Sequence, residues 1–183
     1  MAESGIMTDA IIRPATEADA EALAVLGRQT FLDTFVDEGG FAIPYPAEDL
    51  NPFLEASFGV EAVRAKLNEP GAAWWVAERR GELLAFANTG PNTLPHPKAG
   101  PGNAELRRLY VSKAAQGLGL GTKLLALALE WMEANTDGPL WIGVWSGNVK
   151  AQKLYQAYGF EKAGEYEYPV GRWRDHEFIL RRG

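Results

Sequence analysis

Three glycines at positions 117, 119 and 121 are the residues of this 183-residue chain best suited to holding a ligand. They stand between a strand-like and a helix-like segment, in the run Gln116, Gly117, Leu118, Gly119, Leu120, Gly121, Thr122. Glycine lets a ligand approach the backbone, and the first turn of a helix offers unpaired N–H groups and a positive dipole end. The spacing therefore predicts a phosphate site, with a flexible helix start as the alternative.

Two common nucleotide-binding motifs do not fit this loop. A Walker loop ends in Gly-Lys-Ser/Thr, whereas this one ends in Gly121, Thr122 and Lys123. A Rossmann G-x-G-x-x-G motif would match Gly117 and Gly119, but Thr122 occupies the place of its last glycine or alanine. An NAD-binding protein therefore stays only as a third hypothesis.

A second group of residues follows the loop, and the two together resemble a known family. The segment from Glu105 to Val111, followed by Gln-x-x-Gly-x-Gly, resembles the acetyl-CoA site of GCN5-related N-acetyltransferases (GNAT). That family's later pattern N-x-x-A-x-x-L/F-Y-x-x-x-G-F is matched by Asn148, Ala151, Leu154, Tyr155, Gly159 and Phe160. The resemblance covers roughly residues 103–165, and it implies that acetyl-CoA is the cosubstrate.

The resemblance also implies how the cofactor is held. Backbone groups of Leu109 and Val111 would pair with the pantetheine arm as an added strand does, and the glycine loop would hold the pyrophosphate. Asn148 would bind the arm, and Ala151 would keep its helix close to the cofactor. The implied cofactor-binding residues are Leu109, Tyr110, Val111, Gln116, Gly117, Leu118, Gly119, Leu120, Gly121, Thr122, Asn148, Ala151 and Tyr155.

Two side chains are candidates for proton transfer during direct transfer of the acetyl group to a primary amine. Tyr155 matches the family's general acid, which would protonate the leaving thiolate. Glu105 is the candidate base, with a water relay as its alternative. The structural alternatives are a packed aromatic for Tyr155 and an ion pair with Arg107 or Arg108 for Glu105.

The elements that must position these residues alternate between strand-like and helix-like segments. We expect an α/β or α+β domain over residues 10–183, after a tail at 1–9, with a mixed central sheet of about six or seven strands flanked by helices. The resemblance implies that parallel strands 4 and 5 splay apart. Residues 35–58 are expected to form a loop with short helical pieces. Strands are expected at 10–13, 74–78, 82–88, 104–111, 140–145, 160–168 and 173–180, and helices after Thr16 and at 60–67, 118–135 and 150–158.

Composition excludes several classes of function. The chain has no cysteine and two histidines, so thiolate catalysis and a Cys or His metal site are not expected. Its net charge of −6 argues against a nucleic-acid binder with a broad basic surface. No apolar run has the length of a membrane span. We expect a cytoplasmic protein.

The acceptor is less defined by the sequence than the cofactor. Residues 1–102 carry a net charge of −8 and residues 103–183 carry +2, which suggests a small cationic amine steered by an acidic acceptor loop. Two segments, 31–35 and 145–148, look most like the family branch that acetylates polyamines. A protein N-terminal acetyltransferase and a non-catalytic acyl-CoA sensor are the alternatives, and the family's last hairpin makes a homodimer an expectation. The carboxylates expected to attract the amine are Asp33, Asp37, Glu38, Glu48 and Asp49.

Overall fold

A seven-stranded mixed sheet forms the centre of the molecule in the computed structural model, which describes residues 9–183. The strand order is β1-β2-β3-β4-β5-β7-β6. The predicted tail lies, apart from its last residue, outside the described residues. The strands are β1 (Ile11–Pro14), β2 (Ala73–Arg79), β3 (Glu82–Pro91), β4 (Ala104–Val111), β5 (Leu140–Trp145), β6 (Glu161–Val170) and β7 (Trp173–Arg182). The helices are α1 (Ala20–Phe31), α2 (Ala47–Phe58), α3 (Val60–Leu67), α4 (Leu120–Asn135) and α5 (Val149–Ala157).

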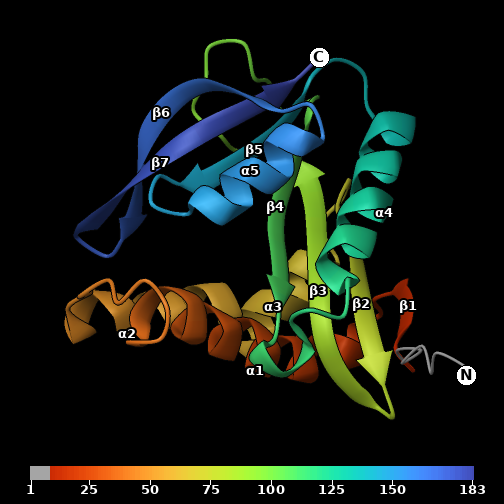
Figure 1. Cartoon of the computed structure of the whole chain (residues 1–183), viewed down its shortest axis with the longest axis vertical. Coiled ribbons are helices and arrows are strands. Elements are labelled where there is room, and N and C mark those ends of the chain that lie inside the picture. The colour runs from red at the N-terminus through yellow and green to blue at the C-terminus, as the bar shows by residue number, and fades with distance from the viewer. Residues whose placement is uncertain (1–8) are drawn as a thin grey trace, which may run out of the picture.

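The sheet opens between β4 and β5, its one parallel pair among the described residues. These strands pair only at their starts, where Ala104, Glu105 and Leu106 lie opposite Leu140, Trp141 and Ile142. Beyond Leu106, β4 continues to pair with β3 as far as Val111, while β5 turns toward β7. Figure 1 shows the result, with β1 to β4 in one group and β5 to β7 in another. The splayed pair expected from the resemblance is confirmed.

A β-bulge in β4 decides which of its side chains share a face. Asn88 pairs with Arg108 and the next residue, Thr89, pairs with Leu106, so Arg107 is the extra residue. A bulge shifts the alternation of side chains by one position. Glu105, Arg108 and Tyr110 consequently lie on one face of the sheet, although simple alternation would separate Glu105 from the other two.

Helices cover both faces of the sheet. Four side chains of α4 are fully buried against β2, β3 and β4: Leu124, Leu125, Ala128 and Met132. On the opposite face, α1 and α3 pack on Trp74, Val76 and Phe86. Figure 1 shows α4 and α5 on the near side of the strands, α1 passing below the lower end of β4, and α2 to the left of it. No helix in the described part of the chain is both long and apolar enough to span a membrane.

The expectation of a loop over residues 35–58 is wrong for its second half. Residues Ala47–Phe58 form the twelve-residue helix α2, with Pro52 inside it. Proline removes one N–H donor and disfavours a helix interior. The buried stripe Leu50, Leu54 and Phe58, spaced four residues apart, outweighs that loss by packing against α1 and β6. A π-helical turn over Leu32–Val36 leads from α1 into the segment before α2.

Candidate active site

A large cavity lies where β4 and β5 diverge. Its volume is about 390 Å³, within the roughly 300–1,000 Å³ typical of a pocket for one small molecule. Six of the residues singled out from the sequence line it: Glu105, Leu109, Tyr110, Asn148, Ala151 and Tyr155. The predicted residues Val111 and Gln116 to Thr122 are not among its lining residues.

The glycine loop lies beyond this cavity, at the start of α4. Gly117 and Gly119 have φ angles of 85° and 76°, in the left-handed region that favours glycine. Gly119 caps the helix, and Leu120, Gly121 and Thr122 form its first turn. In the described chain their N–H groups have no acceptor, and the N–H of Lys123 is the first to bond, to the Gly119 carbonyl at 3.2 Å. Such a row of unpaired donors fits an anionic phosphate group.

Tyr155 reaches the cavity from α5. Only 9% of the residue is exposed, and its ring lies 6.4 Å from that of Phe160. Its hydroxyl has no hydrogen-bond partner within residues 9–183. Burial raises the pKa of Tyr155 to about 12, so the hydroxyl keeps its proton at neutral pH. The geometry supplies a protonated, unengaged phenol at the cavity wall.

Asn148 has a structural task as well as a place in the cavity. Its side-chain oxygen accepts a hydrogen bond from the N–H of Ala151 at 3.1 Å, which caps α5. The amide nitrogen of Asn148 is left to donate to a ligand. The same residue therefore fixes the start of the helix that carries Tyr155 and presents a donor to the cavity.

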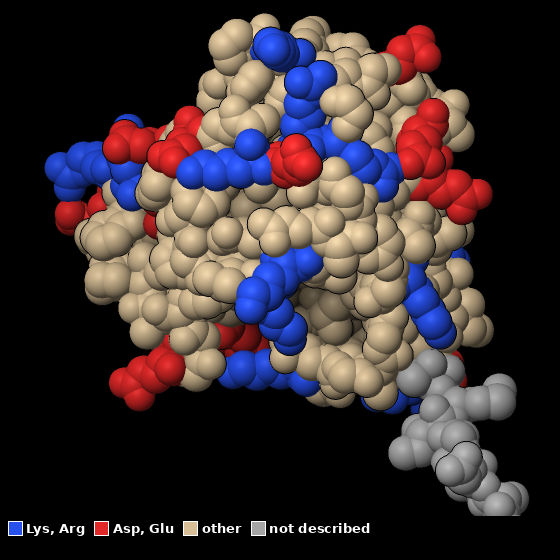
Figure 2. Space-filling view, turned by 45° about the horizontal axis from the view of Figure 1, so that its top comes forward, with Lys and Arg blue, Asp and Glu red and all other residues tan. Residues whose placement is uncertain are grey.

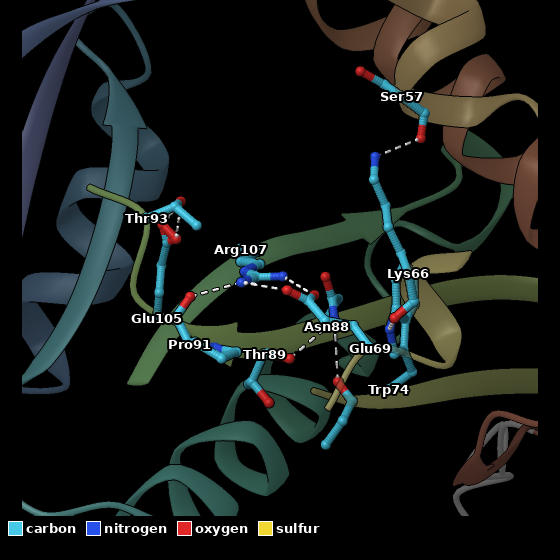
Figure 3. Close-up of polar contacts among 11 residues, drawn as sticks. Ser57, Lys66, Glu69, Trp74, Asn88, Thr89, Pro91, Thr93, Glu105 and Arg107 are labelled. Atoms are coloured by element: carbon cyan, nitrogen blue, oxygen red, sulfur yellow. Dashed lines mark hydrogen bonds and ion pairs between the residues drawn. The ribbon is translucent and has the colours of Figure 1, made fainter. Parts of the chain in front are cut away.

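Glu105 is buried, and the ion pair considered from the sequence is absent. The Thr93 hydroxyl lies 2.9 Å from both carboxylate oxygens of Glu105, which share its one hydrogen. Arg107 instead pairs with Glu69 and donates to the Pro91 carbonyl at 2.7 Å, as Figure 3 shows. Burial raises the pKa of Glu105, which makes its carboxylate a better proton acceptor than an exposed one.

A partly buried carboxylate, which the sequence analysis missed, lines the same cavity. Glu177 of β7 accepts a hydrogen bond from the Tyr166 hydroxyl at 3.0 Å. Burial raises its pKa to about 7, and the nearby carboxylates of Asp175 and Glu105 add to the effect. The sequence signal for Glu177 was the alternation of Asp175, His176 and Glu177, because side chains on one face of β7 must point toward the interior.

The residues on either side of Glu177 show which face of β7 points into the cavity. Asp175 points into the cavity and accepts hydrogen bonds from Tyr45 at 2.5 Å and from Trp173 at 2.9 Å. His176 points the other way and lies 2.7 Å from Glu165 on the surface. Asp175 is thus held by two donors, whereas Glu177 has a single protein partner within residues 9–183.

The acidic loop expected to attract the amine does not line the cavity. Asp49 accepts from the Arg172 N–H at 2.8 Å, and Glu48 pairs with the Arg172 side chain. Asp33 lies 3.9 Å from Lys113. The carboxylates that do line it, at positions 105, 175 and 177, all belong to the half of the chain with net positive charge. The expectation that the acidic first half of the chain supplies the carboxylates of the acceptor site is therefore wrong.

One face of the molecule is hollowed, and charged side chains are unevenly placed on it. In Figure 2, Lys and Arg side chains lie beside the hollow, while Asp and Glu lie mostly toward the edges of the view. A positive field beside a recess suits a polyanionic cofactor.

Comparisons with known proteins point to one family. Residues 43–160 match the model of the acetyltransferase (GNAT) family. An uncharacterized N-acetyltransferase of Lactobacillus delbrueckii is 26% identical over 96% of this chain and 98% of its own length. An uncharacterized N-acetyltransferase of Mycobacterium tuberculosis is 25% identical over 88% of this chain and 96% of its own length.

Solved structures show the same fold. The PaiA N-acetyltransferase of Thermoplasma acidophilum, in complex with coenzyme A, aligns with a TM-score of 0.73 at 18% identity, covering 96% of this chain and 99% of the other. A ribosomal-protein-alanine N-acetyltransferase of Brucella melitensis aligns with a TM-score of 0.64 at 28% identity, covering 94% and 98%. The chain therefore belongs to the acetyltransferase (GNAT) family, the acetyl-CoA-dependent N-acetyltransferases that its sequence resembles.

Proposed function

We propose that this protein transfers the acetyl group of acetyl-CoA directly to a small primary amine that is protonated in solution. The observation that carries the proposal is the cavity whose walls include the phenol of Tyr155, which has no protein hydrogen-bond partner, the buried carboxylate Glu105 and the partly buried carboxylate Glu177. An acid and a base in one cavity are what aminolysis of a thioester requires. A cytoplasmic location and a homodimer belong to the same proposal.

The cofactor would lie across the opening between β4 and β5. From Arg107 to Val111, the edge of β4 that faces β5 has no strand partner among residues 9–183. Its N–H and C=O groups can pair with an extended amide-containing arm. The arm would place the thioester near Tyr155 and the phosphates at Gly117 to Thr122. When bound, acetyl-CoA supplies the activated carbonyl carbon.

The chain's own residues would then move two protons. Glu105 or Glu177 accepts a proton from the ammonium group of the acceptor, directly or through a water molecule, so that the amine nitrogen can attack. The new C–N bond forms as the C–S bond breaks, and Tyr155 donates its proton to the leaving thiolate. The nitrogen loses its second proton to water as the amide forms, and Glu105 or Glu177 releases the first proton to solvent. Tyr155 recovers a proton from solvent after the products leave.

The protein N-terminal alternative is supported by one observation, the 28% identity to the ribosomal-protein-alanine N-acetyltransferase. The polyamine branch has no comparable sequence support, because the match to the PaiA N-acetyltransferase is 18% identical and shows the fold alone.

A thiol-release assay tests the proposal. Purified protein is incubated with acetyl-CoA and a panel of small amines, amino acids and peptides with free N-termini, and CoA formation and acetylated product are both measured. We expect turnover with at least one small amine. Binding of acetyl-CoA without transfer to any member of the panel would favour the acyl-CoA sensor instead.

A further inference from the structure

Two positively charged side chains line the cavity without a carboxylate partner. Lys66 of α3 and Arg108 of β4 both contribute to its wall, and neither lies within 4.0 Å of an Asp or Glu oxygen in residues 9–183. Arg107, in contrast, is already paired with Glu69. Two unpaired cations in one recess are a site for an anionic group.

Arg108 is held in place by aromatic rings. Its guanidinium carbon lies 4.4 Å from the centre of the Phe58 ring. It also lies beside the hydroxyl groups of Tyr110 and Tyr168, whose pKa values it lowers against the raising effect of burial. The bulge at Arg107 turns Arg108 toward this face of the sheet. The guanidinium is thus fixed in the cavity wall before any ligand binds.

Lys66 lies close enough to Arg108 for their positive charges to repel each other. Burial, followed by the charges of Arg108 and Arg107, lowers the pKa of Lys66 to about 8. Like charges placed together cost free energy, and a bound anion offsets that cost. An ammonium group has three donors, and Lys66 uses one of them on the Ser57 carbonyl, at 3.1 Å.

A purely structural explanation accounts for only part of this arrangement. Ser57 belongs to the last turn of α2, so Lys66 satisfies a carbonyl at the negative end of that helix. Arg108 donates no hydrogen bond to a carbonyl of α2 in the described residues. Coenzyme A does not account for the pair either, because the proposed phosphate donors, Gly117 to Thr122, lie outside this cavity.

Lys66 and the carboxylate of Glu105 lie on different sides of the cavity. Figure 3 shows Lys66 extending toward Ser57 on one side, and Glu105 with Thr93 on the other, with Arg107 between them. Glu177 lies with Tyr166 on the outer hairpin. An acceptor with an ammonium group at one end and an anion at the other matches this separation.

We propose that Lys66 and Arg108 bind a carboxylate of the acceptor, so that the substrate is an amino acid or a similar amine bearing a carboxylate. The proposal rests on the proposed acetyltransferase function and narrows its acceptor. A diamine or polyamine would instead bring a second cation toward Lys66 and Arg108, which repel it.

Pairs of amines that differ only by the carboxylate test this directly. We compare kcat/KM for ornithine with that for putrescine, and for lysine with that for cadaverine, at saturating acetyl-CoA. We expect the carboxylate-bearing member to be preferred about 10- to 100-fold, the range for losing charge-assisted hydrogen bonds. In Lys66→Met and Arg108→Gln this ratio should fall by about tenfold or more in each variant.

Two exposed cations serve as matched controls. Lys98→Met and Arg174→Gln remove the same charges outside the cavity and should leave the ratio unchanged. The ratio is measured within each variant, so a change in overall stability does not imitate the effect. Preference for the diamines, or an unchanged ratio in both cavity variants, would overturn this proposal alone. No transfer to any amine would overturn the acetyltransferase proposal along with it.

Discussion

Tyr155 is the residue on which the proposed proton transfer to the thiolate depends. Its raised pKa, about 12, keeps the hydroxyl protonated over the range in which such an enzyme works. We expect Tyr155→Phe to lower kcat by about 10²-fold or more, because the thiolate must then leave without a proton. Acetyl-CoA affinity, measured by calorimetry, should stay nearly unchanged.

The residue that caps the end of α5 offers a matched control for this change. Tyr158 is a partly buried tyrosine of the same region, and it does not line the cavity. Tyr158→Phe should therefore leave kcat close to that of the unmodified protein. Equal kcat values for the two variants would rule out Tyr155 as the general acid.

Glu177 gives the reaction a predictable pH dependence. With a pKa of about 7, its carboxyl is protonated below that pH and cannot accept the proton of the ammonium group. We expect kcat/KM to rise as the pH increases through 7, and Glu177→Gln to remove that inflection. The exposed carboxylate Glu165 provides the control, since Glu165→Gln should keep it. An inflection that survives in Glu177→Gln would assign the base to Glu105 or to water.

The stability of the fold provides a second measurement on Glu177. Its pKa is higher in the folded state than the ordinary value of 4.5, so the folded state binds the proton more tightly than the unfolded chain does. The contribution is complete below about pH 4.5 and is lost as the pH rises through 7. Urea unfolding at pH 5 and pH 8 should show a smaller loss of stability for Glu177→Gln than for the unmodified protein.

At the scale of elements, the loop before α4 depends on glycine for its backbone rather than for space. A Cβ atom added at Gly119 would meet nothing within 4 Å, but the φ angle of Gly119, +76°, is strained for every residue other than glycine. We expect Gly119→Ala to cost about 1 kcal/mol of unfolding free energy and to weaken acetyl-CoA binding. Gly100→Ala is the control, because Gly100 also has open space but no positive φ. Equal acetyl-CoA affinity in both variants would contradict the predicted phosphate site.

The elements nearest the cofactor motifs were the ones that the sequence predicted best. The expected strands 104–111 and 140–145 agree residue for residue with β4 and β5. The strand β5 is a continuous apolar run that follows Gly138 and Pro139, and β4 follows a segment rich in proline and glycine. The helix α2 was missed because Pro52 and the surrounding aromatic residues read as a loop. The buried stripe of α2 identifies this segment as a helix only when the surface of α1 that it packs against is known.

The site could be predicted only in part for a similar reason. Tyr155 and Asn148 belong to a local motif, whereas Glu177 enters the cavity through pairing of β7 with β5. Lys66 enters from α3, and the bulge at Arg107 sets the direction of Arg108. Such placements depend on contacts between distant segments, which periodicity along the chain does not encode.

At the scale of the whole molecule, the sheet consists of two groups of strands joined by three parallel residue pairs. A ligand that pairs with both β4 and β5 would tie the groups together. It binds the folded chain only, so it must raise the unfolding free energy, by about 2.7 kcal/mol at a hundred times its Kd. For a chain of this length that corresponds to a rise in Tm of roughly 5–10 °C. We expect acetyl-CoA to produce this shift and NADH to leave Tm unchanged.

Hydrogen exchange shows whether the stabilisation arises at the opening between the strands. Amides of β4 from Arg107 to Val111 that do not bond to β3 have no partner across the opening, so they should exchange quickly in the free protein. Acetyl-CoA should slow them, together with the amides of Leu120 to Thr122, because it accepts hydrogen bonds from both sets. The amides of β1 and β2 are the internal control, since they lie on the far side of β3. Protection spread evenly over the sheet would mean global stabilisation without an arm in the opening, and the predicted backbone roles of Leu109 and Val111 would then be wrong.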